Sequence, residues 1–298
     1  MRISLKRSSS EPRKRPLPRE ILALKRKLIR LCAQRSPEYL LTHLLHYKLK
    51  PFHQGWLNFQ KKNKKSLILA PRGHGKSTIL TISYSLWKMV KDPDIRILIV
   101  SNTQSQATSF LREIREHLET NPLILSSLGN LKGSKWTDQE ISLKSRRRIS
   151  KEVTLTALGV EGAILTRHFD LIILDDVVDE ENARTDLQRS RLKNWFYTTL
   201  MPTLEPGGEF HIIGTRYHYR DLYGDLLEDA YKDKSLVSKA IGEDGEALWE
   251  DRFSLDELLA RRKEAGTIIF NAQYQNDPSL MKGSIFRESW FRYYDTPP

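Results

Sequence analysis

Short, mostly apolar runs alternate with amphipathic segments through the middle of this chain. The apolar runs cover residues 67–70, 95–101, 153–157, 171–174 and 210–214. The segments between them, at 76–91, 104–119 and 185–200, carry apolar residues at helical spacing. Strands that are apolar on both faces must be covered on both faces, and strands separated by helices pair in parallel. The pattern predicts an α/β fold with a mostly parallel central sheet flanked by helices.

One segment departs from this alternation. Residues 140–158 contain two runs of alternating polarity on either side of Arg146, Arg147 and Arg148. Such alternation around a polar break predicts a β-hairpin, here with a strongly basic tip. The three arginines are therefore candidates for contacts with the phosphates of a nucleic acid.

Composition narrows the class of protein. The chain has 298 residues, of which 39% are hydrophobic, enough for one large domain or two small ones. Its single cysteine, Cys32, cannot form a disulfide within the chain, which favours a reducing compartment. No apolar run approaches the roughly 20 residues that span a bilayer, and the basic N-terminus lacks the apolar segment of a secretory signal. We expect a soluble intracellular protein without membrane contact.

The net charge of +12 is concentrated near the N-terminus. Residues 1–35 hold twelve Lys and Arg against two Glu, and residues 36–65 hold six Lys against one Glu. This asymmetry favours contact with a polyanion, most simply nucleic acid, although a solubilising tail or a targeting patch has the same composition. Residues 1–19, rich in Ser and Pro, are expected to be a disordered basic tail, and 20–50 to form helices interrupted at Pro37.

The first apolar run leads into Ala-Pro-Arg-Gly-His-Gly-Lys-Ser-Thr at residues 70–78. This matches the phosphate-binding pattern G-x-x-x-x-G-K-[ST], with Ala70 in place of the first glycine. Backbone N–H groups of the turn and of the following helix then converge on a phosphate. Lys76 is expected to reach the β- and γ-phosphates and Ser77 to hold Mg²⁺. The expected nucleotide-binding residues are Pro71, Arg72, Gly73, His74, Gly75, Lys76, Ser77 and Thr78.

Two carboxylates follow another apolar run. Residues 171–174 deliver Asp175 and Asp176 to the carboxyl edge of the predicted sheet, where ligands bind in open α/β folds. Asp175 is expected to hold Mg²⁺ through water, and Asp176 to orient or deprotonate the attacking water. Most hydrolases of this layout carry Glu at the second position, and Asp is one methylene shorter. Glu180 or Glu181 is therefore an alternative for that role.

Three further residues are weaker candidates. Phe52 could stack on a base and Gln54 could pair with the adenine edge, although an aromatic residue in such a segment commonly belongs to the core. Thr215 follows the apolar run 210–214 and is a candidate sensor of the γ-phosphate, with a satisfied turn hydroxyl as the alternative. The eight histidines show no metal-ligand spacing, so no zinc site is assigned.

Taken together, these segments resemble the large terminase subunit of tailed bacteriophages, the motor that packages DNA into procapsids. The most specific stretches are Thr215-Arg216-Tyr217-His218 with Asp221-Leu222, and Ala272-Gln273-Tyr274-Gln275-Asn276. The matching segments are residues 51–53, 70–78, 101–122, 159–176, 205–227 and 270–294. In this family an altered phosphate loop with an arginine at the position of Arg72 is typical, which implies that the loop is functional.

The resemblance implies a RecA-like P-loop ATPase core over residues 51–215 and a small lid with a linker over 216–298. It implies hydrolysis of ATP with Mg²⁺, translocation of double-stranded DNA, and assembly as a homo-oligomeric ring. Whether the isolated chain is a monomer or an oligomer is left open by the sequence. A portal protein and a small terminase subunit are the implied partners, in the bacterial cytoplasm and transiently on the procapsid. A nuclease domain usually follows, and the sequence stops at Pro298 where it would begin, so DNA cleavage is not expected.

Two arginines match terminase patterns for stabilising charge on the γ-phosphate. Arg72 lies within the phosphate loop, where it can serve its own nucleotide or hold the shape of the loop. Arg167 precedes the strand of Asp175 and is expected to act in trans as an arginine finger, with an ordinary surface arginine as the alternative.

Two other functions compete with this interpretation. A helicase-like translocase would need a second lobe, and the 84 residues after Gly214 are too few for one. A non-catalytic nucleic-acid-binding protein with a relic nucleotide site is disfavoured by Lys76, Ser77 and Asp175.

Overall fold

The computed structural model describes residues 18–160, 162–164 and 166–281. Residues 1–17 of the expected tail lie outside these residues, whereas Pro18 precedes the first helix and Arg19 begins it. An eight-stranded sheet forms the centre, in the order β3-β4-β5-β2-β6-β7-β1-β8. Its strands are β1 (Lys65–Leu69), β2 (Ile97–Ser101), β3 (Lys132–Trp136), β4 (Glu140–Leu143), β5 (Leu155–Gly159), β6 (Phe169–Asp175), β7 (Leu204–Gly214) and β8 (Ser235–Val237).

The six strands from β5 to β8 in this order are parallel, as the alternation of apolar runs and helices predicts. The expected hairpin is confirmed as the antiparallel pair β4–β5, in which Ile141 lies opposite Leu155. β3 and β8 were not expected from the sequence. β3 has mostly exposed side chains, and β8 has only three residues, so neither carries a clear apolar pattern.

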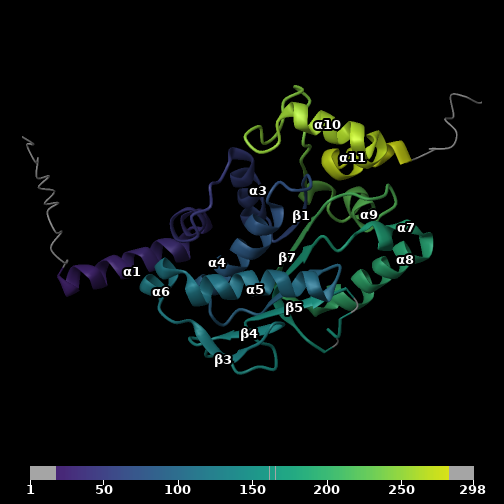
Figure 1. Cartoon of the computed structure of the whole chain (residues 1–298). Coiled ribbons are helices and arrows are strands. Elements are labelled where there is room, and N and C mark those ends of the chain that lie inside the picture. Colours follow the sequence, from purple (N-terminus) through teal and green to yellow (C-terminus); the bar gives the residue numbers. More distant parts are fainter. Residues whose placement is uncertain (1–17, 161, 165, 282–298) are drawn as a thin grey trace, which may run out of the picture.

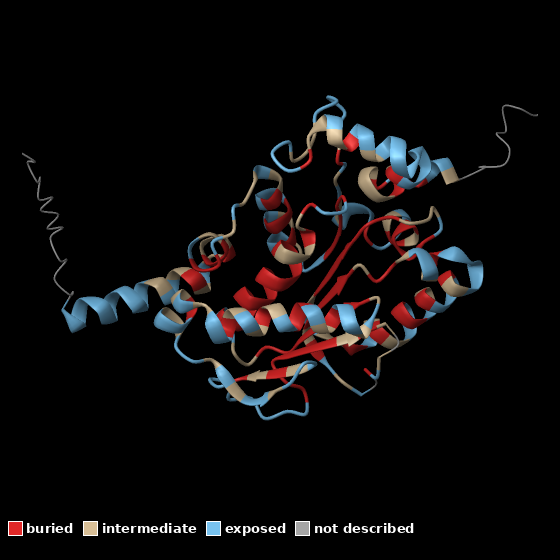
Figure 2. Ribbon diagram, in the orientation of Figure 1, coloured by how far each residue is buried: buried red, intermediate tan, exposed pale blue. Residues whose placement is uncertain are grey.

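Helices cover both faces of the sheet (Figure 1). One face is covered by α2 (Pro37–Tyr39) with a π-helical turn (Leu40–Leu44), α3 (Pro51–Lys62), α4 (Tyr84–Lys91), α5 (Gln104–Thr120) and α6 (Pro122–Leu128). α1 (Arg19–Arg35) packs on α4 and α6 and is exposed along most of its length. The other face carries α7 (Glu180–Arg184), α8 (Asp186–Asn194) with its continuation to Leu200, and α9 (Leu222–Glu228). Because successive strand side chains point to opposite faces, Leu67 and Ile68 enter different cores. The strands are buried throughout the centre of the sheet (Figure 2).

A small separate core forms the lid. Ala240, Phe253, Leu258 and Phe270 pack together beneath α10 (Leu255–Ala265) and α11 (Thr267–Gln275). The sequence placed the start of the lid at residue 216. In the structure α9 packs on the main core and β8 pairs with β1, and both elements lie after that residue. No helix within the described ranges combines the length and apolar character needed to cross a membrane.

The basic hairpin tip is not the free cluster of charge that the sequence suggested. The Arg146 guanidinium donates to the carbonyls of Asp94, Ile95 and Glu152, each at 3.1 Å. Arg148 forms an ion pair with Asp170 at 3.2 Å. The backbone N–H groups of Arg147 and Arg148 both donate to the Asp94 carboxylate. Two of the three guanidinium groups are thus occupied in holding the loop to the amino-terminal edge of the sheet.

Candidate nucleotide-binding site

The loop after β1 has the conformation that its two glycines allow. Gly73 and Gly75 have φ angles of 80° and 79°, in the left-handed region. A Cβ at Gly73 would lie 2.9 Å from the Phe253 ring, and one at Gly75 would lie 3.3 Å from His53 Nε2. The positive φ favours glycine at both positions, and at Gly73 a Cβ would also crowd the Phe253 ring. The helix begins at Ser77 and continues into α4, so the loop opens onto a helix N-terminus.

The acidic residues of β6 meet this loop. Asp175 is fully buried, and its carboxylate accepts hydrogen bonds from Ser77 Oγ at 3.0 Å and Thr81 Oγ1 at 2.5 Å. Lys76 Nζ lies 3.0 Å from Asp176 Oδ2. Burial, with the neighbouring Asp176 charge, raises the pKa of the Asp175 carboxyl above its ordinary value. The fold thus brings Lys76, Ser77 and Asp175, to which the sequence assigned phosphate and metal chemistry, together with Asp176, which it assigned to the attacking water.

These groups fit a magnesium nucleotide. A hydroxyl and a carboxylate in contact, Ser77 and Asp175, are the hard oxygen ligands that Mg²⁺ takes when phosphates supply the rest. Lys76 is 6% exposed and faces a carboxylate that a phosphate would replace. Asp176 Oδ1 is buried without a hydrogen-bond partner among the described residues. Burying a carboxylate oxygen without a hydrogen bond costs free energy unless a ligand or a water molecule donates one.

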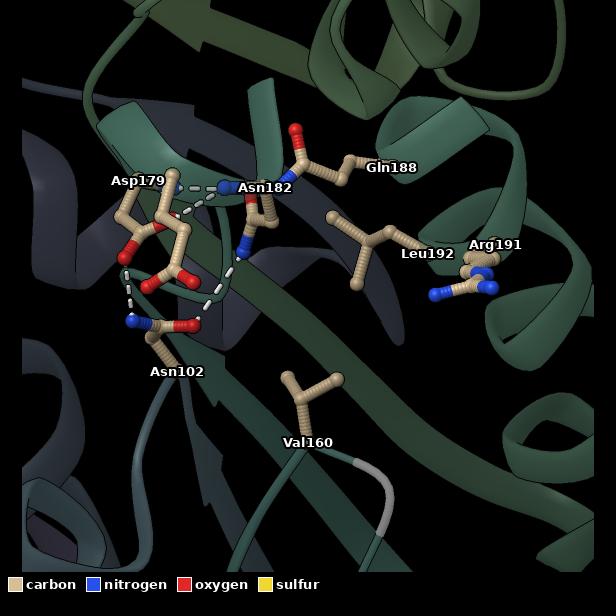
Figure 3. A pocket seen from close by; sticks show the side chains of 8 residues that line it. Asn102, Val160, Asp179, Asn182, Gln188, Arg191 and Leu192 are labelled. Carbon is tan, nitrogen blue, oxygen red and sulfur yellow. Dashed lines mark hydrogen bonds between the residues drawn. The ribbon is translucent and has the colours of Figure 1, made fainter. Parts of the chain in front are cut away.

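Glu180 and Glu181 lie farther along the chain, exposed in the first turn of α7. Glu181 lines a pocket of about 220 Å³ with Asn102 and Asp179. Figure 3 shows Asn182 donating to Asn102, at 3.2 Å, on the wall of this pocket. Of the three carboxylates considered for the attacking water, only Asp176 is paired with Lys76.

The segment before β1 forms α3 and turns a different residue toward the loop than the sequence suggested. Gln54 is exposed, and Phe52 packs against the rings of Trp56 and Trp249 at 5.0 and 5.7 Å. His53 faces inward. Its Nδ1 accepts from the Lys50 N–H at 3.2 Å, so Nε2 carries the proton and donates to the His74 carbonyl at 2.9 Å. The roles of Phe52 and Gln54 toward adenine stay predictions.

The remaining residues of the phosphate loop are either buried or hydrogen-bonded to the lid. Pro71 and His74 are buried, whereas Thr78 is half-buried in the first helical turn. Exposed Arg72 is tied to the lid, since its Nη1 donates to Gln273 Oε1 at 3.1 Å and its N–H to the Gln273 carbonyl at 3.2 Å. Thr215 donates to the carbonyl of Ala70 at 3.2 Å, which joins the end of β7 to the start of the loop.

A family of known proteins matches most of this chain. A family model described as the terminase large subunit, T4likevirus type, N-terminal part, matches residues 67–293. The chain belongs to this terminase family. The large terminase subunit of Enterobacteria phage T3 is 28% identical to it over 255 residues, which cover 73% of this chain and 42% of that relative. The chain thus spans less than half the length of this curated relative.

Solved terminase structures share the fold. The ATPase domain of the large terminase of Thermus phage P74-26 superimposes with a TM-score of 0.55 at 16% identity, and a point mutant of that domain with 0.57 at 15%. Each covers 81% of this chain and 98% of the other. The prediction of a RecA-like α/β core is confirmed.

In this terminase, Arg167 lies away from the phosphate loop of its own chain. It precedes the amino end of β6, whereas Asp175 stands at the carboxyl end of the same strand. Its guanidinium pairs with Glu140, donates to Thr156 Oγ1 at 3.2 Å, and lies over the Phe169 ring. Arg167 therefore cannot serve the nucleotide of its own chain. A role in trans stays a prediction.

The terminase loop also contains a histidine that is kept neutral. His74 Nδ1 donates to the Arg72 carbonyl at 3.0 Å, and its Nε2 is buried without a partner among the described residues. Burial, with a smaller effect of the nearby His53, Lys76 and Arg252, lowers the pKa of His74 to about 4. An unfolded histidine titrates near 6.5. Because the folded pKa is the lower one, the stabilisation is complete above about pH 6.5 and is lost as pH falls toward 4.

We expect this histidine to make the terminase fold sensitive to mild acid. Between pH 7 and pH 5, His74 should lower the free energy of unfolding by about 2 kcal/mol. Urea unfolding at both pH values should show this loss in the wild type and a smaller one in His74→Asn, whose amide retains the bond to the Arg72 carbonyl. Equal pH dependence of the two proteins would contradict the assignment.

Proposed function

We propose that this chain is the ATP-hydrolysing motor part of a terminase and that it drives double-stranded DNA into a procapsid. One observation carries the proposal: Lys76 and Ser77 of the loop each contact one of the paired carboxylates Asp176 and Asp175. The T3 relative is named a terminase large subunit, and the Thermus phage structure an ATPase domain.

The chemistry of the site follows from its charges. When bound, magnesium ATP supplies the phosphoanhydride bond and the metal neutralises part of its charge. Lys76 exchanges its contact with Asp176 for the γ-phosphate, where it stabilises the charge that develops there. Asp176, released from Lys76, accepts a hydrogen bond from the attacking water and orients it. Ser77 and Thr81 hold the Asp175 carboxylate in place.

The loop has two connections that suit a motor. Thr215 links it to the end of β7, and Arg72 links it to Gln273 of the lid, so a change at the γ-phosphate can move the lid. We assign Thr215 the role of sensor and Arg72 that of a coupling residue. As the family resemblance implies, a ring of such chains, a portal protein and a small terminase subunit would complete the machine in the bacterial cytoplasm and on the procapsid.

The proposal is tested by phosphate release from ATP, measured with and without DNA. We expect hydrolysis that depends on Mg²⁺ and is stimulated by double-stranded DNA. Stimulation by single-stranded DNA alone would favour a helicase-like translocase. Nucleic-acid binding without any hydrolysis, under conditions where the chain is assembled, would favour a non-catalytic protein with a relic site.

His53 should act as a positioning residue for the loop. Replacing it with alanine removes the hydrogen bond to the His74 carbonyl, and one such bond is worth about 1 kcal/mol. We expect the KM for ATP to rise about 3- to 10-fold with a smaller change in kcat, because the loop holds phosphate less well. His53→Gln, which can donate from its amide, should recover part of the affinity.

Asn58→Ala, at an exposed position of the same helix, is the matched control and should behave as wild type. If His53→Ala loses thermal stability yet keeps its KM, His53 serves the fold and not the loop.

A further inference from the structure

Four lysines surround one cleft at the amino-terminal edge of the sheet. Lys62 and Lys64 flank the end of α3, Lys65 begins β1, and Lys234 ends the turn before β8. All four residues are exposed. The remaining wall includes residues 204–208, the first part of β7, and the cleft has a volume of about 520 Å³. We call this the lysine cleft.

The positive charge of the lysine cleft is almost unopposed. Within residues 18–160, 162–164 and 166–281, no ion pair joins any of its four lysines to a carboxylate. Lys64 Nζ donates only to the Gly207 carbonyl, at 3.2 Å. The acidic residue on the wall, Glu205, already pairs with Arg96 at 2.9 Å. The hairpin tip differs, because Arg146 there donates to backbone carbonyls and Arg148 pairs with Asp170.

The lining indicates the chemistry of the partner. Lysine ammonium groups contact phosphates as point charges and carry no information about bases. The described wall offers no aromatic ring for stacking a base, and its amide side chain is that of Asn63. A polymer of phosphodiesters would satisfy several lysines at once, and its affinity would not depend on sequence. Independence of sequence is what a motor needs when it moves along an entire genome.

The lysine cleft and the nucleotide site lie at opposite ends of the same two strands. β1 begins at Lys65, on the cleft, and leads to the phosphate loop, and β7 likewise runs from the cleft to Thr215 (Figure 1). Five residues of strand span about 17 Å. DNA in the cleft would therefore leave the nucleotide site open, while the same two strands connect both.

We propose that the lysine cleft is a sequence-independent contact for the phosphate backbone of the DNA that this terminase moves. The inference rests on the proposed motor function for the identity of the polymer. It replaces the hairpin tip as the main basic contact of the described chain.

The test compares two triple variants that remove the same charge. Lys62→Gln, Lys65→Gln and Lys234→Gln neutralise three of the four lysines of the cleft and keep Lys64, which donates to the Gly207 carbonyl. Lys144→Gln, Arg262→Gln and Lys263→Gln neutralise three exposed residues elsewhere. Binding to a duplex of random sequence is measured by fluorescence anisotropy between 50 and 200 mM salt, with single-stranded DNA and RNA as parallel probes. Unfolding midpoints check that both variants are folded.

We expect the cleft variant to lose about two to three units from the slope of log K against log salt on duplex DNA, and the control variant less than one. ATP hydrolysis without DNA should be unchanged in both, while its stimulation by DNA should fall only in the cleft variant. Equal slopes for the two variants would overturn the inference. So would a cleft variant that binds RNA or single-stranded DNA more weakly than the wild type but binds duplex DNA equally well. If the wild type binds duplex DNA through the cleft but hydrolyses no ATP, the proposed motor function is wrong and the proposed DNA contact is still supported.

Discussion

Lys76→Ala should reduce ATP hydrolysis by about 10²- to 10³-fold or more. The lysine is buried between the loop and β6, and its ammonium already faces an anion, the Asp176 carboxylate, at 3.0 Å. Without it, the charge that develops on the γ-phosphate oxygens loses its main compensation from the protein, while the backbone of the loop still binds phosphate. Turnover should therefore fall far more than nucleotide affinity.

Lys91→Ala is the matched control, since Lys91 ends the same helical run and is exposed. Steady-state phosphate release and binding of a fluorescent ATP analogue, measured on both variants, separate turnover from affinity. Near-normal turnover in Lys76→Ala would remove this loop from the reaction and with it the proposed function.

The second large effect should identify the carboxylate that orients water. We expect Asp176→Asn to lower turnover by about 10²-fold, within the range for general acid–base catalysis, and Glu180→Gln and Glu181→Gln to stay within about twofold of wild type. Asp176 contacts Lys76 and has a buried oxygen without a partner in the described part of the chain, whereas the glutamates are exposed on α7. Asp175→Asn should also abolish turnover.

The asparagine at position 176 keeps the shape of the side chain, so a loss of rate reports the missing charge. Titration with Mg²⁺ distinguishes the two aspartates, because excess metal should partly rescue Asp175→Asn and not Asp176→Asn. If Asp176→Asn turns over normally and Glu180→Gln or Glu181→Gln does not, the glutamate holds the water.

Much of the site could be predicted because its residues belong to local patterns. Lys76 and Ser77 follow a strand at a spacing set by one turn, and Asp175 ends an apolar run of four residues. Parallel strands place such ends at one edge of the sheet, so the contact between Ser77 and Asp175 followed from topology. His53 escaped notice because a histidine in an aromatic segment has the same pattern whether it packs in the core or supports a loop. His53 belongs to the terminase-like segment 51–53, and that resemblance was the signal that could have identified it as a site residue.

The sequence by itself determined the central strands of the sheet, the helices on both faces and the position of the phosphate loop, because burial imposes a short-range periodicity of apolar residues on each element. Only the tertiary structure decided which charges are free. Arg146 and Arg148 are bound to Asp94 and Asp170 from other elements, whereas Lys62, Lys65 and Lys234 converge without a carboxylate partner among the described residues. Those pairings join residues far apart along the chain, and no local pattern records them. The pairing of β8 with β1 is likewise a contact between distant parts of the chain. The three residues of β8 are too few to show a pattern that predicts it.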